Sequence, residues 1–305
     1  MPITEPVVVS QTIYELKYPS RAIRTAQRLG LTNRQNLVWS WYEPRNFGDW
    51  IGPYLFKAMT GKTPLHYPGR HKKLSRARAL VTAGSILRHI QSDNVYSVWG
   101  SGIISQQDVF ARPYKVLAVR GPMSRKRLIE LDYPSTEVFG DPAVLMPYVL
   151  PPCGINKKYD VGIIPHYSSL AKVQNNLGRM EEVLIIDVTQ RIDEVVRQIQ
   201  QCKTTLSSSL HGIILSHAYH VPSTWIEADV SLQGDNVKFT DYYLSCGENV
   251  PEKPLSLDYV GGIHGLKAAG DCGTLPDHSR LVGPLWQSCP FSQNLSRATQ
   301  AAMGN

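Results

Sequence analysis

Short apolar runs that end in a glycine turn recur through the first half of the chain. They read NLVWSWYEPRNFGD, ALVTAGSI, VYSVWGSGII and KVLAVRGP, and their β-branched and aromatic content is typical of buried strands. Two are followed by helical spacing, with Gly61 placed as the C-cap of the first helix and Pro122 as the first residue of the second. The apolar positions of the first helix are Ile51, Tyr54, Leu55, Ala58 and Met59.

The second half of the chain repeats the pattern. DVGIIPHY, VLIIDVT and VPSTWIEA are typical of buried strands, and RIDEVVRQIQQC has the spacing of an amphipathic helix. Between the halves, Leu150 to Asp160 combines prolines, a glycine and charge, which indicates a linker. We therefore predict an α/β protein with parallel sheets covered on both faces, divided into domains 1–152 and 153–305. From Gly247 to Arg280 glycine and proline increase, so we expect an irregular C-terminal part.

Composition narrows the class of protein. With 42% hydrophobic and 19% charged residues, the 305-residue chain has the composition of a soluble globular protein and not of a disordered or fibrous one. Apolar runs are too short to span a bilayer, and MPITEPVVVSQT lacks the features of a signal peptide, so we expect a cytoplasmic protein. Five scattered cysteines without CxxC spacing argue against a disulfide framework and a zinc site.

The common sequence motifs for metal and nucleotide binding are missing from this chain, and this excludes several kinds of site. HExxH, HxH and paired acidic motifs do not occur, so no metal site is expected. GxGxxG and GxxxxGK[ST] are also missing, which disfavours a tightly held dinucleotide or ATP. A net charge of +7 favours an anionic partner: a nucleic acid, a phosphorylated substrate or an acidic membrane surface. Charge alone does not choose among these three.

The segment TTLSSSLHGIILSHAYH places unusual polar chemistry on one strand-to-helix turn. Ser207, Ser208 and Ser209 are positioned to bind phosphate or carboxylate oxygens at a helix N-terminus, although one serine could simply cap a buried helix. His211 falls in the first helical turn, where the helix dipole disfavours a protonated imidazole by about 0.3–1 kcal/mol. A bound phosphate at about 4 Å would favour it by about 4 kcal/mol. The alternative is a core histidine bonded to a carbonyl.

Further candidates lie at other predicted strand ends. In NFGDW, Asp49 is a candidate general base beside Asn46 and Gly48, or these residues only shape the turn and cap the helix. In AVRGP, Arg120 next to Gly121 is placed to hold a carboxylate through two guanidinium nitrogens at once.

Three other features leave both structural and functional interpretations open. Lys238 and His166 are either surface residues or ligand contacts. GDPAVL around Asp141 is interpreted as a structural turn. The basic stretch from Gly69 to Leu80 is either a solvated face or a patch for anionic lipid or pyrophosphate.

In their order along the chain these segments resemble the polysaccharide pyruvyl transferase family. The resemblance extends from about Asn36 to Gly247 and rests on NFGDWIGPYLFKAMTGK, VWGSGII, AVRGPMSRKRL, GDPAVLMPY, VGIIPHY and SSSLHGIILSHAYHVPSTWI. It implies two Rossmann-like domains in a GT-B-like arrangement, with the active site in the interdomain cleft. It also implies transfer of an enolpyruvyl-derived group from phosphoenolpyruvate to a sugar, forming a cyclic ketal, typically across the 4- and 6-hydroxyls, and releasing phosphate. Phosphoenolpyruvate is then the donor substrate, and no cofactor is expected.

The resemblance also assigns roles to residues. Arg120, His211 and Lys238 match positions for donor binding or catalysis; His211 is our candidate acid. Asp49 is the candidate base. The expected substrate-binding set is completed by Ser207, Ser208, Ser209, Asn46, Gly48, Gly121 and His166.

One position departs from the family pattern. Some members carry arginine where this chain has Ser209, and Lys238, Lys115 or Arg112 are candidates to supply the missing charge. The expected acceptor is a polysaccharide or lipid-linked oligosaccharide at the cytoplasmic face of the inner membrane, with no nucleic acid partner. Two alternatives are a GT-B glycosyltransferase that uses a nucleotide sugar and a non-catalytic basic module that binds polyanions.

Overall fold

The structure is a computed structural model of the 305-residue chain. It describes residues 36–38, 46–62, 64–66, 79–152, 154–178, 180–228, 234–251, 253–257 and 261–291, with a few isolated residues between 22 and 31. The basic stretch from Gly69 to Leu80 lies outside these ranges except for its last two residues. Within the described ranges, no helix has the length and apolar character needed to cross a bilayer.

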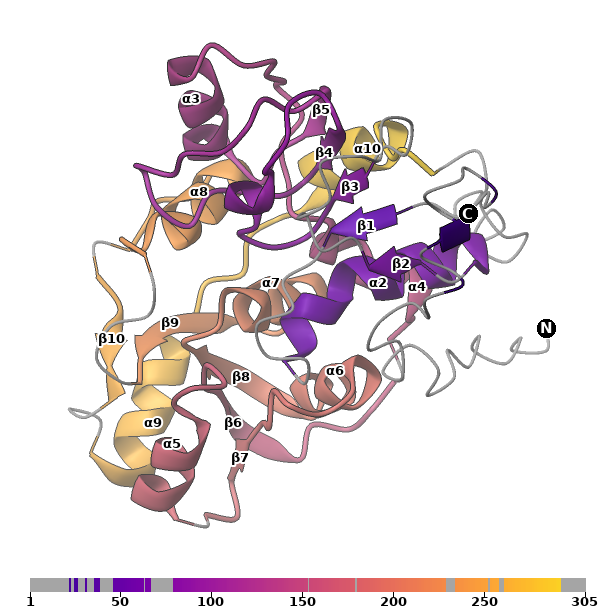
Figure 1. Ribbon diagram of the computed structural model, residues 1–305. Helices are drawn as coiled ribbons and strands as arrows, with labels where there is room; N and C mark the ends of the chain where they lie inside the picture. Colours follow the sequence, from indigo (N-terminus) through magenta and orange to yellow (C-terminus); the bar gives the residue numbers. More distant parts are fainter. Residues whose placement is uncertain are drawn as a thin grey trace.

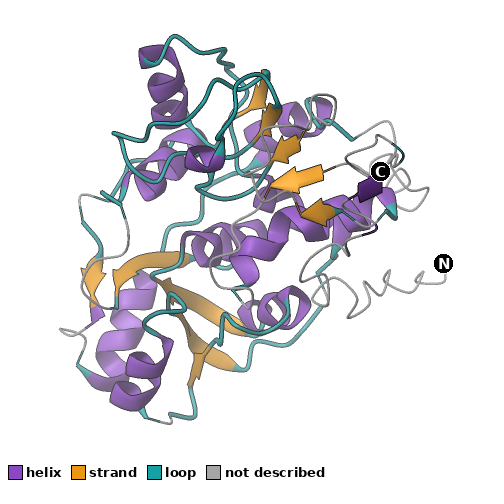
Figure 2. Cartoon of the chain, viewed as in Figure 1, coloured by secondary structure: helices purple, strands orange, loops and turns teal. Residues whose placement is uncertain are grey.

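Two parallel sheets form the framework, and the described residues give each of them five strands (Figures 1 and 2). The first has the order β2-β1-β3-β4-β5, with β1 Asn36–Val38, β2 Leu65–His66, β3 Ala79–Val81, β4 Tyr96–Trp99 and β5 Lys115–Ala118. The second has the order β10-β9-β8-β6-β7, with β6 Tyr159–Ile164, β7 Val183–Ile185, β8 Cys202–Ser207, β9 Ser223–Glu227 and β10 Leu255–Ser256. The predicted α/β class with parallel sheets is confirmed, while the GT-B arrangement stays a prediction.

Helices connect and cover the strands. The helices and 3-10 turns are α2 Phe47–Thr60, η2 Leu87–His89, α3 Pro122–Glu130, η3 Pro142–Leu145, α4 Met146–Val149, α5 Leu170–Leu177, α6 Ile192–Gln200, α7 Leu210–Ala218, α8 Val237–Cys246, α9 Gly262–Asp271 and α10 Ser279–Gln287. Both predicted helix signals are confirmed: Gly61 ends α2 at φ 69° and donates to the Lys57 carbonyl, and Pro122 begins α3. Helices lie on both sides of the second sheet, as expected for parallel strands (Figure 2).

The C-terminal region is more regular than its glycine content suggests. The prediction of an irregular segment from Gly247 to Arg280 is wrong for α9 and β10. In α9, Gly270 packs so closely on β8 that an added Cβ would lie 2.3 Å from the Thr204 Oγ1. Glycine therefore brings this helix close to the sheet, and tertiary packing outweighs its poor intrinsic helix propensity.

The two halves of the chain share a hydrophobic core. One cluster of buried side chains joins Phe47 and Ile51 of α2 to Ile213 of α7, and α2 and α7 lie between the two sheets (Figure 1). The chain then crosses back: in α10, the Leu285 carbonyl accepts a hydrogen bond of 3.0 Å from the Trp99 Nε1 of β4. In the sequence, the predicted linker lies after the last strand of the first sheet and runs into the first strand of the second. The division into domains 1–152 and 153–305 stays a prediction.

Candidate active site

His211 brings the carboxyl ends of the two sheets together. It lies in the first turn of α7, directly after β8, and its side chain is 14% exposed. An added Cβ at Gly48 would lie 2.5 Å from its Nδ1, and one at Gly84, after β3, would lie 3.7 Å from its Cε1. Its Nε2 is 3.6 Å from the Asp141 Oδ2. Three segments of the first half therefore surround one histidine of the second half.

Asp141 is the main residue of this site that the sequence interpretation missed. It lies just beyond Phe139, which pairs in parallel with Val119 after β5, and it is fully buried. Its Oδ1 caps η3 by accepting from the Ala143 N–H at 3.0 Å, as the structural interpretation required. Its Oδ2 accepts from the Gly84 N–H at 3.2 Å and also faces the imidazole. A carboxylate after a glycine at a strand end was the available signal.

The ionisation of Asp141 is decided by opposing effects. Burial raises the pKa of its carboxyl. The nearby His211 imidazole, the Ala143 N–H and the Arg120 guanidinium together outweigh this effect and lower the pKa below its usual value. The site therefore contains a buried carboxylate in its charged form next to the imidazole.

Arg120 is fully buried, and all of its guanidinium nitrogens have partners within the protein. Nε donates to the Asp241 Oδ2 at 3.0 Å, Nη1 to the Ser85 Oγ at 2.6 Å and Nη2 to the Ile103 carbonyl at 2.6 Å. The predicted contact with a substrate carboxylate stays a prediction. What the structure contains is an internal ion pair between residues 121 positions apart in the sequence.

Asp241 joins the two halves through this ion pair. From α8 it accepts hydrogen bonds from the N–H groups of Met123 and Ser124 at 2.8 and 3.0 Å, and from the Ser124 Oγ at 2.6 Å. A carboxylate at this place also interacts favourably with the dipole of α3. Gly121 permits the approach, since an added Cβ would lie 2.0 Å from the Asp241 carbonyl oxygen. The structure thus gives Gly121 a packing role, and its contact with substrate stays a prediction.

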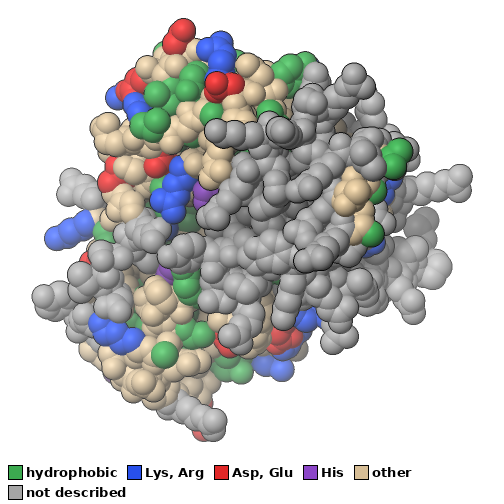
Figure 3. All heavy atoms as spheres, in the orientation of Figure 1, with side chains coloured by type: hydrophobic (Ala, Val, Ile, Leu, Met, Phe, Trp, Pro, Cys, Tyr) green, Lys and Arg blue, Asp and Glu red, His purple; other side chains and the backbone are tan. Residues whose placement is uncertain are grey.

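Lys238 lies close to the charge of Arg120, and His166 lies close to the charge of Lys238. Burial and the Arg120 charge lower the pKa of Lys238, at the start of α8, to about 8. Burial and the Lys238 charge lower the pKa of His166, which follows β6, to about 4. The charges that shift both groups are positive, so an anion bound here would relieve the repulsion. On the face drawn in Figure 3, histidine and basic side chains are visible between the upper and lower parts of the molecule.

Each of the three serines has a hydrogen-bond partner within the protein. The Ser207 Oγ donates to the Ser209 carbonyl at 2.8 Å, and the Ser208 Oγ accepts from the His166 N–H at 2.9 Å. The Ser209 Oγ accepts from the Gly212 N–H at 3.4 Å as the N-cap of α7. The capping alternative is therefore confirmed for Ser209. Contact of the three hydroxyls with a substrate anion stays a prediction.

The NFGDW turn reaches the same place from the first half. Asn46 is the N-cap of α2, and its Oδ1 accepts from the Gly48 N–H at 3.4 Å. Asp49 lies in the first turn, and its N–H donates to the Asn46 carbonyl at 3.1 Å. Gly48 is the part of the turn in contact with His211. The structure thus confirms the capping role of Asn46, and the role of Asp49 as a base stays a prediction.

Three basic residues were candidates to replace the charge of an arginine at position 209, and they lie in two different parts of the structure. Lys115 begins β5, at the opposite end of the strand from Arg120, and strands rise about 3.3 Å per residue. Arg112 lies at the same amino end, where its Nη1 donates to the Asp132 carbonyl at 2.6 Å. Lys238 alone of the three lies beside Arg120 and His166.

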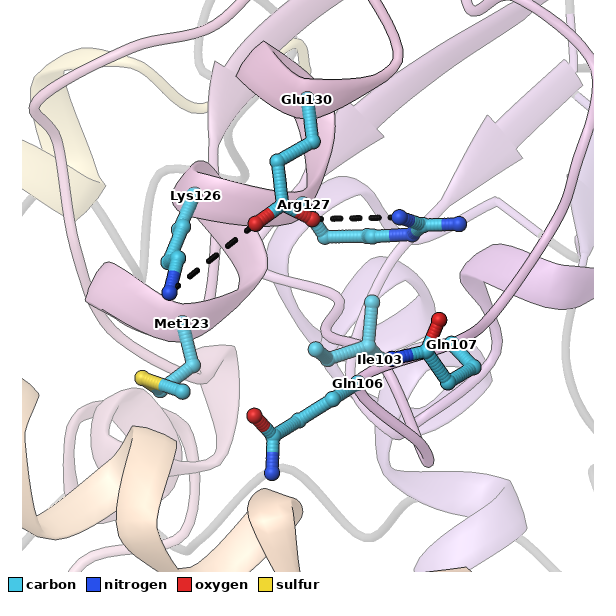
Figure 4. Close-up of a pocket in the computed structure, with 7 residues that line it drawn as sticks. All are labelled: Ile103, Gln106, Gln107, Met123, Lys126, Arg127 and Glu130. Carbon is cyan, nitrogen blue, oxygen red and sulfur yellow. Dashed lines mark hydrogen bonds and ion pairs between the residues drawn. The ribbon is translucent and has the colours of Figure 1, made fainter.

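A polar pocket of about 160 Å³ lies next to the surroundings of Arg120 (Figure 4). Its lining residues are Ile103, Gln106, Gln107, Met123, Lys126, Arg127 and Glu130. Lys126 and Arg127 both pair with Glu130, at 3.9 and 3.1 Å. The pocket adjoins the surroundings of Arg120, because the Ile103 carbonyl accepts from its guanidinium.

Comparison with known proteins gives a family match over the central part of the chain. Residues 98–229 match the polysaccharide pyruvyl transferase model. The uncharacterized protein L143 of Acanthamoeba polyphaga mimivirus is 36% identical over 118 residues, 35% of this chain and 39% of the relative. The succinoglycan biosynthesis protein ExoV of Rhizobium meliloti (strain 1021) is 26% identical over 137 residues, 45% of this chain and 42% of the relative. The match thus spans about two fifths of the length of these relatives. No solved structure is significantly similar.

Proposed function

Since residues 98–229 belong to the polysaccharide pyruvyl transferase family, we propose that the protein transfers a pyruvyl group to a sugar during polysaccharide biosynthesis. In this proposal phosphoenolpyruvate is the donor, a cyclic ketal across two sugar hydroxyls is the product, and phosphate is released. The acceptor is a polysaccharide or its lipid-linked repeat unit. The name of the related ExoV, a succinoglycan biosynthesis protein, supports the link to polysaccharide biosynthesis.

The structural observation that supports this proposal best is the pair of basic groups, Arg120 and Lys238, whose charges act on the surroundings of His211 through Asp141 and His166. Phosphoenolpyruvate carries a phosphate and a carboxylate, so its site has to offset several negative charges. Lys238 and His166 lie where the neighbouring charges are positive, and the Arg120 charge also acts on Asp141, the partner of His211. We place the donor between Lys238 and His211, with Ser208 and Ser209 at its edge.

The reaction needs one acid and a route for two hydroxyl protons. His211 donates a proton to the methylene carbon of the donor, which becomes a methyl group, and the first sugar hydroxyl adds to the neighbouring carbon. The second hydroxyl displaces phosphate from the same carbon and closes the ketal. Of the two hydroxyl protons released, one restores His211 and the other leaves through Asp49, the proposed base. His211 is in contact with Gly48, the residue before Asp49, and this supports the proposal that both groups act in one site.

The direct test is incubation with phosphoenolpyruvate and a panel of terminal galactosides, glucosides and mannosides. Inorganic phosphate and the ketal methyl signal in NMR should appear together on at least one sugar. Replacing His211 by Asn should abolish both signals; ketal formation by this variant would refute the role of the acid. The same panel with nucleotide sugars is the control, since sugar transfer without any dependence on phosphoenolpyruvate would identify a glycosyltransferase instead.

A further inference from the structure

The buried carboxylate of Asp141 has a geometry that a turn alone does not require. Its Oδ1 is sufficient to cap η3, whereas its Oδ2 is directed to both Gly84 and the His211 ring. We propose that Asp141 is a positioning residue that holds His211 with a proton on Nε2 and leaves Nδ1 as the nitrogen that faces the substrate. The kinetic consequences rest on the proposed function, while the position of the proton does not.

The first argument concerns the Nε2 side of the ring. The Nε2 is buried and has no hydrogen-bond partner of normal length among the described residues, and the carboxylate oxygen Oδ2 of Asp141 lies 3.6 Å from it. Asp141 is fully buried, and backbone N–H groups of Gly84 and Ala143 fix both of its oxygens. An ionised carboxylate only accepts hydrogen bonds, so a favourable contact requires the proton on Nε2.

The second argument concerns the opposite side of the ring. Since Nε2 is buried, the 14% of the side chain that is exposed belongs to other atoms. Nδ1 faces Gly48 in the first turn of α2, where an added methyl group would lie 2.5 Å away. Glycine lets the α2 backbone come this close to the ring, and a side chain at position 48 would collide with Nδ1. A proton that passes between the ring and a ligand therefore passes through Nδ1.

The consequence for the reaction is a fixed direction of proton transfer. The charged ring carries protons on both nitrogens, and the one on Nδ1 goes to the methylene carbon of the donor. The neutral ring keeps the proton on Nε2, and Asp141 stays ionised throughout. The freed Nδ1 then accepts one of the two hydroxyl protons, which restores the starting state.

The test is the tautomer of His211, measured by ¹⁵N NMR on histidine-labelled protein at mildly alkaline pH. The signal is assigned by its loss in His211→Gln. We expect the wild-type protein to carry the proton on Nε2. In Asp141→Asn, the side-chain oxygen can still cap Ala143, which places the NH₂ group toward Nε2 and should move the proton to Nδ1.

The matched control is Asp108→Asn. Asp108 is also a buried carboxylate, and its Oδ2 accepts from the Ile104 N–H at 2.8 Å, so this variant should keep the wild-type tautomer. A proton on Nδ1 in the wild-type protein, or an unchanged tautomer in Asp141→Asn, would overturn the proposal. The wild-type spectrum decides the first point even if Asp141→Asn does not fold.

Kinetics provide a second, separable measurement. In Asp141→Asn the kcat for ketal formation should fall roughly 10²-fold with little change in the KM for phosphoenolpyruvate, because the acid is misoriented while the donor site is intact. A higher KM for phosphoenolpyruvate with an unchanged kcat would contradict a positioning role. If the wild-type protein forms no ketal on any acceptor, the proposed function fails, while the tautomer measurement still tests the role of Asp141.

Discussion

The buried ion pair between Arg120 and Asp241 gives a quantitative prediction for stability. Both side chains are fully buried, and the Asp241 carboxylate also accepts two backbone N–H bonds at the start of α3. Asp241→Asn removes the negative charge and leaves a buried guanidinium without compensation, which costs about 3–5 kcal/mol. Domains are typically stable by about 5–15 kcal/mol, so this variant should lose a large share of its stability.

Urea unfolding followed by circular dichroism measures this loss. The control is Glu137→Gln, which removes the exposed pair between Arg125 and Glu137, also 3.0 Å long, and should change the unfolding free energy by less than about 1 kcal/mol. The double variant Arg120→Met with Asp241→Leu leaves no buried charge and should recover part of the loss. A change below about 1 kcal/mol in Asp241→Asn would refute the reasoning.

Three further predictions follow from the same region. Burial lowers the pKa of His217 to about 3 and of His278 to about 4, so the unfolded chain binds protons near pH 6.5 while the folded protein does not. Stability should therefore fall as the pH drops from about 6.5 towards 4, and His278→Gln should flatten this slope in unfolding measured against pH. Gly121→Ala should lower the thermal midpoint, because its Cβ meets the α8 backbone at 2.0 Å. Lys238→Met should raise the KM for phosphoenolpyruvate roughly 10-fold or more, because the proposed charge contact with the donor is lost.

Each of these predictions has an outcome that would contradict it. Equal stability at pH 7 and pH 4.5 would show that the buried imidazoles are not held neutral. A Gly121→Ala protein with an unchanged melting temperature would mean that α8 can move away without cost, and Gly283→Ala, where an added Cβ meets nothing within 4 Å, is the comparison. The pKa of Lys238, lowered to about 8, predicts that the wild-type KM rises above that pH. A KM for phosphoenolpyruvate that stays constant above pH 8 would exclude a charge contact from Lys238.

Local rules were sufficient for the secondary structure around the site. Gly61 and Pro122 mark helix ends because each satisfies a backbone requirement that depends only on neighbouring residues. The same rules placed His211 and the NFGDW turn at strand ends, and parallel strands bring such turns to one edge. For this reason the sequence predicted that the turn with His211 and the NFGDW turn lie close together.

Long-range partners were beyond those rules. Arg120 has the chemistry of an anion-binding residue, and nothing near it in the sequence indicates that Asp241 would occupy its guanidinium. Asp141 satisfied the pattern of a turn; its place after a glycine at a strand end marked it as a candidate, but nothing near it in the sequence indicated His211 as its second contact. α9 was missed because its glycines lower helix propensity, and the packing of Gly270 against β8 is visible only in three dimensions.

The return of α10 to the first half has a mechanical consequence. Besides the bond from Trp99 to Leu285, the ring of Phe291 contacts the edges of Phe56 and Trp99 at centroid distances of 5.2 Å. In a hinge motion that separates the sheets, α10 and Phe291 must therefore either move together with the first half or lose their contacts with it. Fragments 1–152 and 153–305, expressed separately, would each expose apolar surface to solvent and should associate when mixed.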